Sequence, residues 1–215
     1  MSALPELNGL STAALSDALD KLGRPGQLLG LAPLQNGQRM VGRAFTVAYR
    51  PAGFPAGTVG DYLDQARPGE VIVLDNQGRL DATVWGDILT ALAAQKGIAG
   101  TVIDGVNRDV YRALELGYPI YSRARYMRTG KDRVEVQSVG EPVNIAGVQV
   151  VAGDLIVGDD DGVLVVPTAI EAEVVAIARK ISTREEAIME AVVGGVSLAE
   201  ARARQGYHML QRGEA

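Results

Sequence analysis

The chain has 215 residues, a formal net charge of −5 and no cysteine. This length is enough for one sizeable hydrophobic core. The acidic balance argues against general nucleic-acid binding, which depends on the neutralisation of phosphates by Lys and Arg. The lack of cysteine excludes disulfides, thiolate nucleophiles and thiolate-bound metals. The single histidine, His208, excludes a three-histidine metal site and a Ser-His-Asp triad in the middle of the chain.

The N-terminal sequence indicates the cellular compartment in which we expect the protein. They lack a basic region followed by a long apolar run, the pattern of a secretory signal peptide. No stretch approaches the ~18 consecutive apolar residues that a membrane helix needs. We therefore expect a cytoplasmic protein without a membrane partner, and the absence of cysteine agrees with a reducing compartment.

Helix and strand patterns alternate in the first half of the chain. Ser11 can cap a first helix with its hydroxyl, and Gly23 and Pro25 end this helix. Strands are then predicted at residues 41–49, 70–75, 99–104 and 119–122, and helices at 58–66, 87–96 and 109–116. Short strands that alternate with helices are typical of an α/β fold with a largely parallel sheet.

The second half of the chain has a different pattern. Short strands between glycine-rich turns are predicted at residues 134–137, 142–145, 148–151, 155–158 and 163–166. A long helix over 168–193 ends at Gly194-Gly195, and Ser197 can cap another helix that ends at Gly206. We predict a single α/β domain over residues 1–215, with a central strand-rich core flanked by helices. Residues 168–215 are its helical C-terminal extension.

Arg108 and Asp109 form a first candidate site, because they follow a buried strand and open a helix. Ligands of α/β proteins bind outside the carboxyl ends of the strands, where helix N-termini offer free N–H groups. The Arg108 guanidinium can bind a carboxylate with two parallel hydrogen bonds. Asp109 is a hard oxygen ligand suited to Mg²⁺ or Mn²⁺. The structural alternative is that Asp109 caps the helix and Arg108 forms a surface ion pair.

The segment from Trp85 to Leu89 forms a second candidate site, at the preceding strand-to-helix connection. Gly86 permits a close backbone approach, and the amides of residues 86–89 could face an anion. Asp87 could exchange a proton through water, or it could simply be a carboxylate that stabilises the start of a helix. Trp85 is expected to pack in the core rather than to bind substrate. Two consecutive connections of this kind can converge on one crevice.

The spacing of these residues resembles that of a known family. Asp87 is followed, after twenty residues, by Arg108-Asp109. This pattern resembles the 4-hydroxy-4-methyl-2-oxoglutarate/4-carboxy-4-hydroxy-2-oxoadipate aldolases, which belong to a superfamily with the regulator of ribonuclease activity A (the RraA-like superfamily). The likeness extends from about Ser11 to Arg204. Other matching stretches are SDALDKLG (16–23), VGRAFTV (41–47), PGEVIVLD (68–75), GTVIDGVNRD (100–109) and VGDDDGVLVVP (157–167).

The resemblance implies an RraA-like fold and a metal-dependent retro-aldol reaction that releases pyruvate from a 4-hydroxy-2-oxo acid. Asp109 would hold the divalent cation, Mg²⁺ or Mn²⁺. Arg108 would bind the substrate and stabilise the enolate, and Asp87 would hold the water that removes the C4 hydroxyl proton. Oxaloacetate decarboxylation gives the same enolate, so we expect it as a side activity. The pyruvate part would be bound by the segment that contains Gly86, Ile88 and Leu89.

The resemblance also implies a catalytic Glu from a neighbouring subunit. Glu185 is the expected counterpart, favoured over Glu186, although both could belong to a solvated helix face. A Glu that acts in a neighbouring active site requires a homo-oligomer, and a homotrimer or homohexamer would match the family. Arg123 and Arg125 are candidate ligands for the distal carboxylate of the substrate.

Two other functions stay open at the level of the sequence. One is a protein-binding regulator that inhibits a ribonuclease by contact. The other is a dedicated oxaloacetate decarboxylase, or an aldolase for a sugar-derived 2-oxo acid. The complete set of Asp87, Arg108 and Asp109 favours an enzyme. The run Asp159–Gly162 is expected to be a turn, because a calcium loop needs alternating ligands and a later Glu.

Overall fold

A computed structural model of the chain describes residues 7 and 9–207. By its internal contacts the chain divides into two compact units, residues 27–168 and residues 1–26 with 169–215. The single domain expected over 1–215 stays a prediction, and His208 lies outside the described residues. Within the part that the structure describes, no helix is long and apolar enough to cross a membrane.

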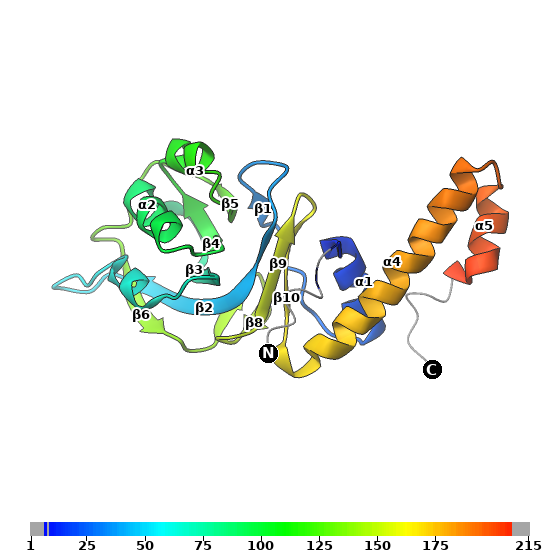
Figure 1. Cartoon of the computed structure of the whole chain (residues 1–215). Helices are drawn as coiled ribbons and strands as arrows, with labels where there is room; N and C mark the ends of the chain where they lie inside the picture. The colour runs from blue at the N-terminus through cyan, green and yellow to red at the C-terminus, as the bar shows by residue number, and fades with distance from the viewer. Residues whose placement is uncertain (1–6, 8, 208–215) are drawn as a thin grey trace. The chain divides into compact units, whose positions relative to one another are not determined.

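An eight-stranded sheet forms the centre of the unit of residues 27–168 (Figure 1). Its strands are β1 (Ala32–Pro33), β2 (Met40–Pro51), β3 (Glu70–Thr83), β4 (Gly100–Asn107), β5 (Ile120–Arg125), β6 (Val134–Val139), β9 (Leu155–Asp159) and β10 (Gly162–Val166). The order is β1-β5-β4-β3-β2-β9-β10, and β6 pairs with β2. The four strands from β2 to β5 run parallel, and the remaining pairs are antiparallel. The α/β class with a largely parallel centre is therefore confirmed.

Each face of this sheet carries its own core. On one face lie α2 (Asp87–Gln95), α3 (Val110–Leu116) and the short 3₁₀ helix η2 (Asp61–Gln65). Figure 1 shows α2 and α3 side by side, and their Ala93 and Ala113 belong to the same buried cluster as Trp85. The other face is covered by the hairpin of β7 (Val143–Ile145) and β8 (Val148–Val150). Burial of apolar side chains on both faces explains why β4 is buried along its whole length.

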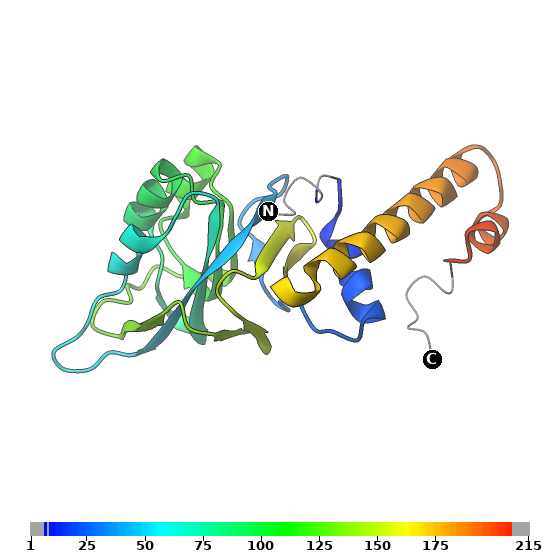
Figure 2. The ribbon, with the colours of Figure 1, turned by 60° about the horizontal axis from the view of Figure 1, so that its bottom comes forward.

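The described residues of the unit of residues 1–26 and 169–215 are mainly helical. It contains α1 (Thr12–Lys21), α4 (Glu171–Val193) and α5 (Leu198–Gln205), and the 3₁₀ turn η3 (Thr168–Ile170) begins at its boundary. Figure 2 shows α4 as the long helix of this unit. Both predicted caps are confirmed, since the Ser11 hydroxyl accepts a hydrogen bond from the Ala14 amide and Ser197 accepts one from the Glu200 amide. Gly206, in the left-handed conformation, ends α5 as predicted.

The helix predicted at residues 58–66 is shorter than expected and of another type. Only Asp61–Gln65 form a helical turn, of the 3₁₀ type. The preceding backbone is bonded elsewhere: the Thr58 carbonyl accepts a hydrogen bond from the Val136 amide, and the Gly57 amide donates to Glu135. Gly57 and Gly60 also have low helix propensity. The residues before the 3₁₀ helix are therefore hydrogen-bonded to β6 and do not extend the helix.

Strand β3 is longer than the predicted 70–75, because it continues to Thr83 through two shifts in its register with β4. Gln77 and Gly78 have φ angles of 55° and 67°, and this left-handed backbone produces the irregularity. The turn predicted at Asp159–Gly162 is confirmed, since these two residues pair at the end of the β9–β10 hairpin. The extension of β3 brings Trp85 and Gly86 to the end of β4.

Candidate active site

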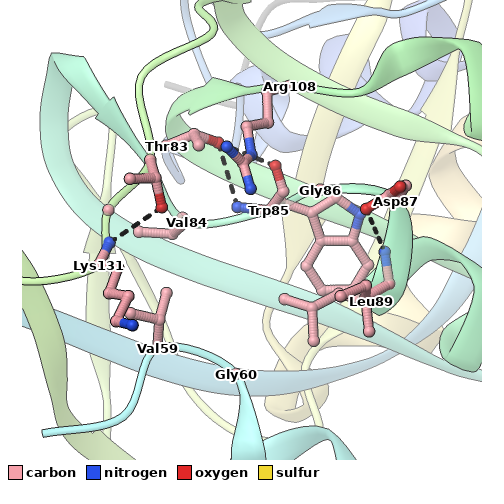
Figure 3. Close-up of a pocket in the computed structure, with 13 residues that line it drawn as sticks. Val59, Gly60, Thr83, Val84, Trp85, Gly86, Asp87, Leu89, Arg108 and Lys131 are labelled. Atoms are coloured by element: carbon pink, nitrogen blue, oxygen red, sulfur yellow. Dashed lines mark hydrogen bonds between the residues drawn. The ribbon is translucent and has the colours of Figure 1, made fainter.

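The two strand-to-helix connections that the sequence predicted as candidate sites lie side by side, because β3 and β4 are neighbouring parallel strands. The chain leaves β3 through Trp85 and Gly86 into α2, and leaves β4 through Arg108 and Asp109 into α3. The Arg108 amide donates a hydrogen bond of 3.0 Å to the Trp85 carbonyl, which ties the two connections together. Figure 3 shows Arg108 close to Trp85 and Gly86. The convergence expected from the topology is thus present.

Asp109 lies at the start of α3 in the left-handed conformation, with φ 53° and ψ 39°. Its carboxylate makes no capping hydrogen bond, so the alternative interpretation as a helix cap is wrong. Instead, Asp109 Oδ2 lies 3.1 Å from Arg108 Nε. Left-handed residues other than glycine concentrate at functional sites, and Asp tolerates this conformation better than most. The backbone therefore directs the carboxylate toward Arg108 and Gly86.

Gly86 leaves the space that this carboxylate occupies. A Cβ atom at Gly86 would lie 2.9 Å from Asp109 Oδ2 and 3.5 Å from Arg108 Nε. The glycine itself has an extended backbone, with φ −149°, which any residue can adopt. Its role is therefore the close approach of another side chain rather than a turn.

Asp87 begins α2 and its carboxylate has two hydrogen-bond donors. Oδ1 accepts from the Ile88 amide at 2.8 Å, and Oδ2 accepts from the Tyr111 hydroxyl of α3 at 3.2 Å. The neighbouring negative charge raises the pKa of Tyr111, chiefly through this hydrogen bond, so the phenol stays protonated as the donor. Asp87 is half-buried. These contacts hold its carboxylate in place while leaving it open to water.

The residues beneath the site form a rigid support. Trp85 is buried, stacks on Tyr118 with ring centroids 6.3 Å apart, and donates from Nε1 to the Thr90 hydroxyl at 2.9 Å. Thr90 in turn donates to the Gly86 carbonyl at 2.8 Å. The expectation that Trp85 is a packing residue is confirmed. Its indole fixes the backbone of Gly86 and thereby the start of α2.

A cavity of about 230 Å³ opens beside these residues. This volume is suited to a small metabolite rather than to a drug-sized ligand. Figure 3 shows the side chains around it. The lining consists of Val59, Gly60, Thr83, Val84, Trp85, Gly86, Asp87, Ile88, Leu89, Arg108, Thr129, Gly130 and Lys131.

Lys131 is a charged lining residue that the sequence did not single out. It lies in the segment between β5 and β6, within a basic run that is typical of a solvated surface. The run consists of Arg123, Arg125, Arg128, Lys131 and Arg133, and no local pattern marks one of its members as reaching the cavity. The parallel bridge between Thr83 and Thr129 brings the segment to the end of β3.

Arg123 and Arg125, the predicted ligands for a distal carboxylate, are bonded elsewhere. Arg123 Nε donates to the buried Asp104 carboxylate, which also accepts the Ala146 amide at 2.9 Å. Arg125 Nη2 donates to the Leu34 carbonyl at 2.9 Å. Neither arginine lines the cavity. Arg123 therefore links the neighbouring strands β5 and β4, and Arg125 links β5 to the residue that follows β1.

Glu185 lies on α4, in the other unit, and is half-buried. Its pKa is raised, first by burial and then by the negative charge of Asp17 on α1. Glu186 is exposed and accepts a hydrogen bond from the Ser182 hydroxyl. The assignment of Glu185 to the active site of a neighbouring subunit stays a prediction.

The side chains present suit a particular kind of metal ion. Among residues 7 and 9–207, no three His, Cys, Asp or Glu side chains gather in one place. A cage of protein ligands, as zinc or calcium needs, is therefore missing from the described part. Mg²⁺ keeps several water molecules and needs only one or two carboxylates. Asp109, the carboxylate expected to hold the ion, fits that requirement.

The fold agrees with the comparisons to known proteins. Residues 12–165 match the model of the RraA-like family, described as Aldolase/RraA, and the chain belongs to this family. A Halalkalibacterium halodurans protein, provisionally named 4-hydroxy-4-methyl-2-oxoglutarate aldolase, is 32% identical over 205 residues that cover 95% of each chain. The Streptomyces coelicolor protein RraAS2, described as an unusual member of the RNase ES inhibitor RraA family, has a TM-score of 0.78 at 33% identity, over 85% of this chain and 92% of its own.

A third relative is much longer. Protein DlpA of Legionella pneumophila is 40% identical over 202 residues, which are 93% of this chain but 33% of DlpA. The chain thus spans about a third of that relative and almost all of the Halalkalibacterium protein.

Proposed function

We propose that the chain is a divalent-metal-dependent carbon–carbon lyase that cleaves a 4-hydroxy-2-oxo acid to pyruvate and a second carbonyl compound. The observation that carries the proposal is the meeting of Asp87, Arg108 and Asp109 beside one small cavity. The aldolase name of the Halalkalibacterium relative supports it. A pure binding surface would have no need of this set.

In this proposal Arg108 binds the 2-oxo acid end of the substrate. Its Nε is engaged by Asp109, and its two terminal nitrogens can donate to the carboxylate and keto oxygens. The first turn of α2 adds amides without partners in the helix. The Ile88 amide already donates to Asp87, whereas within the described residues the Leu89 amide has no acceptor. The Leu89 amide is thus the better candidate of the two for binding the substrate.

Asp109 holds the cation in this proposal, and the contact of its carboxylate with Arg108 keeps it oriented. When bound, Mg²⁺ or Mn²⁺ supplies positive charge that polarises the keto group. The Arg108 guanidinium acts on the same oxygen. As the C3–C4 bond breaks, negative charge moves onto this oxygen, and a fixed cation beside it lowers the barrier.

Asp87 is the acid–base group. Its carboxylate accepts the proton of the substrate C4 hydroxyl through a water molecule, and the same water returns a proton to C3 of the pyruvate enolate. The Tyr111 hydroxyl and the Ile88 amide keep Asp87 in one orientation. Oxaloacetate decarboxylation ends in the same enolate, so the proposed site would perform it as a side activity.

The test is pyruvate release from 4-hydroxy-4-methyl-2-oxoglutarate and from oxaloacetate, with Mg²⁺ and with chelator. Asp109→Asn is the sharpest variant, because Asn keeps the shape and tolerates the left-handed backbone but removes the charge. We expect a fall in kcat/KM of about 10³-fold or more, since metal and guanidinium catalysis are together worth several kcal/mol. Asp64→Asn, an exposed carboxylate outside the cavity, is the control. Pyruvate release at the same rate with Mg²⁺ and with chelator would contradict the proposal.

The alternatives differ in the outcome of the same assay. A dedicated oxaloacetate decarboxylase would release pyruvate from oxaloacetate alone. A ribonuclease regulator, the role that the family name of the Streptomyces protein states, would release none and would inhibit a ribonuclease in a purified assay. Pyruvate release from the two substrates, together with the ribonuclease assay, therefore separates all three.

A further inference from the structure

The sequence contains the pair Asn-Gly twice, as Asn8-Gly9 and as Asn36-Gly37. Asn8 lies outside the described residues, whereas Asn36 and Gly37 form an exposed turn in the loop between β1 and β2. Asparagine is a chemically labile residue, and a following glycine makes it more so, because no Cβ hinders the approach of the glycine nitrogen to the Asn side chain. The turn at Asn36 is therefore a candidate site of spontaneous modification.

The Gly37 amide, which is the nucleophile of such a reaction, contacts a carboxylate. It donates a hydrogen bond of 2.6 Å to Asp160 Oδ1. Asp160 belongs to the short turn between β9 and β10, and Figure 1 shows the tip of this hairpin beside the loop that follows β1. Hydrogen bonds to ionised carboxylates are short and strong. Asp160 is thus placed where a base must stand to accept the proton of this amide.

The side chain of Asn36 is free to react. Within the described residues, no hydrogen bond or ion pair involves it, and the residue is exposed to water. Gly37 has a φ angle of 80°, in the left-handed region that glycine adopts without strain. An electrophile, a nucleophile and a base therefore meet at one exposed turn, and the water that completes the reaction has access to it.

We propose that Asn36 is a self-deamidation site at which Asp160 acts as the general base. The Gly37 nitrogen forms a bond to Asn36 Cγ and gives its proton to Asp160. The bond between Cγ and Nδ2 breaks, and Asp160 delivers the proton to the departing ammonia. Water then opens the cyclic imide. Attack at Cγ yields an aspartate at position 36, and attack at the backbone carbonyl carbon yields an isoaspartate.

The reaction loosens the attachment of the loop to the β9–β10 hairpin. In the imide the Gly37 nitrogen carries no proton, so its hydrogen bond to Asp160 is lost. Both products place a new negative charge at position 36, directly before the residue that contacts Asp160. Like charges at short range repel each other. The inference does not depend on the proposed function, because none of these residues lines the cavity of the candidate active site.

The test follows the full-length protein during incubation at neutral pH and physiological temperature. Peptide mass spectrometry measures conversion at Asn36 and at Asn8, and electron-transfer fragmentation separates aspartate from isoaspartate. Asp160→Ser and Asp161→Ser each remove one carboxylate from the same turn. Serine is the replacement at Asp161, because asparagine there would create another Asn-Gly pair with Gly162.

Asp160→Asn is a second variant that separates basicity from the hydrogen bond. Its side-chain oxygen can still accept the Gly37 amide, but the neutral group is not a base. Circular dichroism checks that each variant is folded. In concentrated urea, where the contact between Gly37 and Asp160 is broken, wild type and the Asp160 variants should convert Asn36 at the same rate.

In the folded protein, we expect conversion at Asn36 to be about 10-fold or more slower in Asp160→Ser and in Asp160→Asn, because a positioned general base is lost. Asp161→Ser should change the rate by less than about twofold, and conversion at Asn8 should be the same in all chains. Equal or faster conversion of Asn36 in the Asp160 variants overturns the inference. So does a wild type in which Asn8 is converted and Asn36 is not.

Discussion

The conformation of Asp109 and the lack of a side chain at Gly86 depend on each other. The left-handed backbone of Asp109 turns its carboxylate toward the α2 connection, and the missing Cβ of Gly86 leaves the room for it. From the sequence alone, Gly86 is expected to let the backbone approach an anion. In the structure, a side chain of the protein fills much of that space. The same carboxylate then stands beside Arg108, at 3.1 Å from its Nε.

Gly86→Ala tests this pairing. The added Cβ would lie 2.9 Å from Asp109 Oδ2, so the carboxylate or Arg108 must move, while the extended backbone of residue 86 accepts alanine without strain. We expect kcat/KM to fall by about 10- to 100-fold, because displacements of about 1 Å in a catalytic group have effects of this size. Gly53→Ala, where the new Cβ makes ordinary contacts, is the control. An active Gly86→Ala enzyme would show that the position of Asp109 is unimportant.

At the scale of elements, Glu135 of β6 connects the loop of residues 51–60 to the sheet. Its Oε2 accepts the amides of Gly57 and Gly53 at 2.8 and 3.1 Å, and its Oε1 accepts Arg50 Nε at 2.8 Å. The pKa of Glu135 is lowered, first by the Gly57 amide, then by the Gly53 amide and then by Arg50. The loop leads into Val59 and Gly60 in the cavity lining. Glu135 thus shapes one wall of the cavity without touching it.

The lowered pKa gives the contribution of Glu135 a defined pH dependence. The stability from this carboxylate is complete above the unfolded pKa of about 4.5 and is lost as the pH falls through the lower pKa of the folded state. Glu135→Gln should lower Tm by roughly 2–4 °C at pH 7. The difference from wild type should shrink as the pH falls below 4.5. Thermal unfolding at several pH values measures it, and a difference that is constant with pH would contradict the assignment.

At the scale of the whole molecule, we propose that the reaction uses residues from more than one chain. Asp87, Arg108 and Asp109 lie in the unit of residues 27–168, and Glu185 lies in the other unit. The resemblance to the aldolases implies that Glu185 serves the neighbouring active site of a homotrimer or homohexamer. This arrangement is a proposal, because it concerns a contact between chains.

Complementation between variants tests it. We expect Asp109→Asn and Glu185→Gln each to be nearly inactive alone, and a mixture that is dissociated and reassembled to regain part of the activity. The physical reason is that a mixed oligomer contains some interfaces with an intact Asp109 on one chain and an intact Glu185 on the next. Light scattering during chromatography measures the size of the assembly. A fully active Glu185→Gln variant, or a monomeric enzyme, would refute the shared site.

The sequence by itself determined the α/β class, the caps at Ser11 and Ser197, and the two strand-to-helix connections that carry Asp87 and Arg108-Asp109. These depend on local rules: the spacing of apolar residues, the chemistry of caps, and the fact that parallel strands end at the same edge of a sheet. Only the tertiary structure decided the fate of residues 58–66, where bonds of Gly57 and Thr58 to β6 leave a short 3₁₀ helix at Asp61–Gln65.

The tertiary structure also decided which residue of the basic run lines the cavity. Arg123, Arg125 and Lys131 are alike in the sequence, since all three belong to one basic run. Partners far away in the chain separate them: Asp104 binds Arg123, the Leu34 carbonyl binds Arg125, and the contact of Gly130 with Thr83 brings Lys131 to the cavity. Long-range pairing of this kind leaves no local pattern, because it depends on strand register and on chain segments that approach each other only after folding.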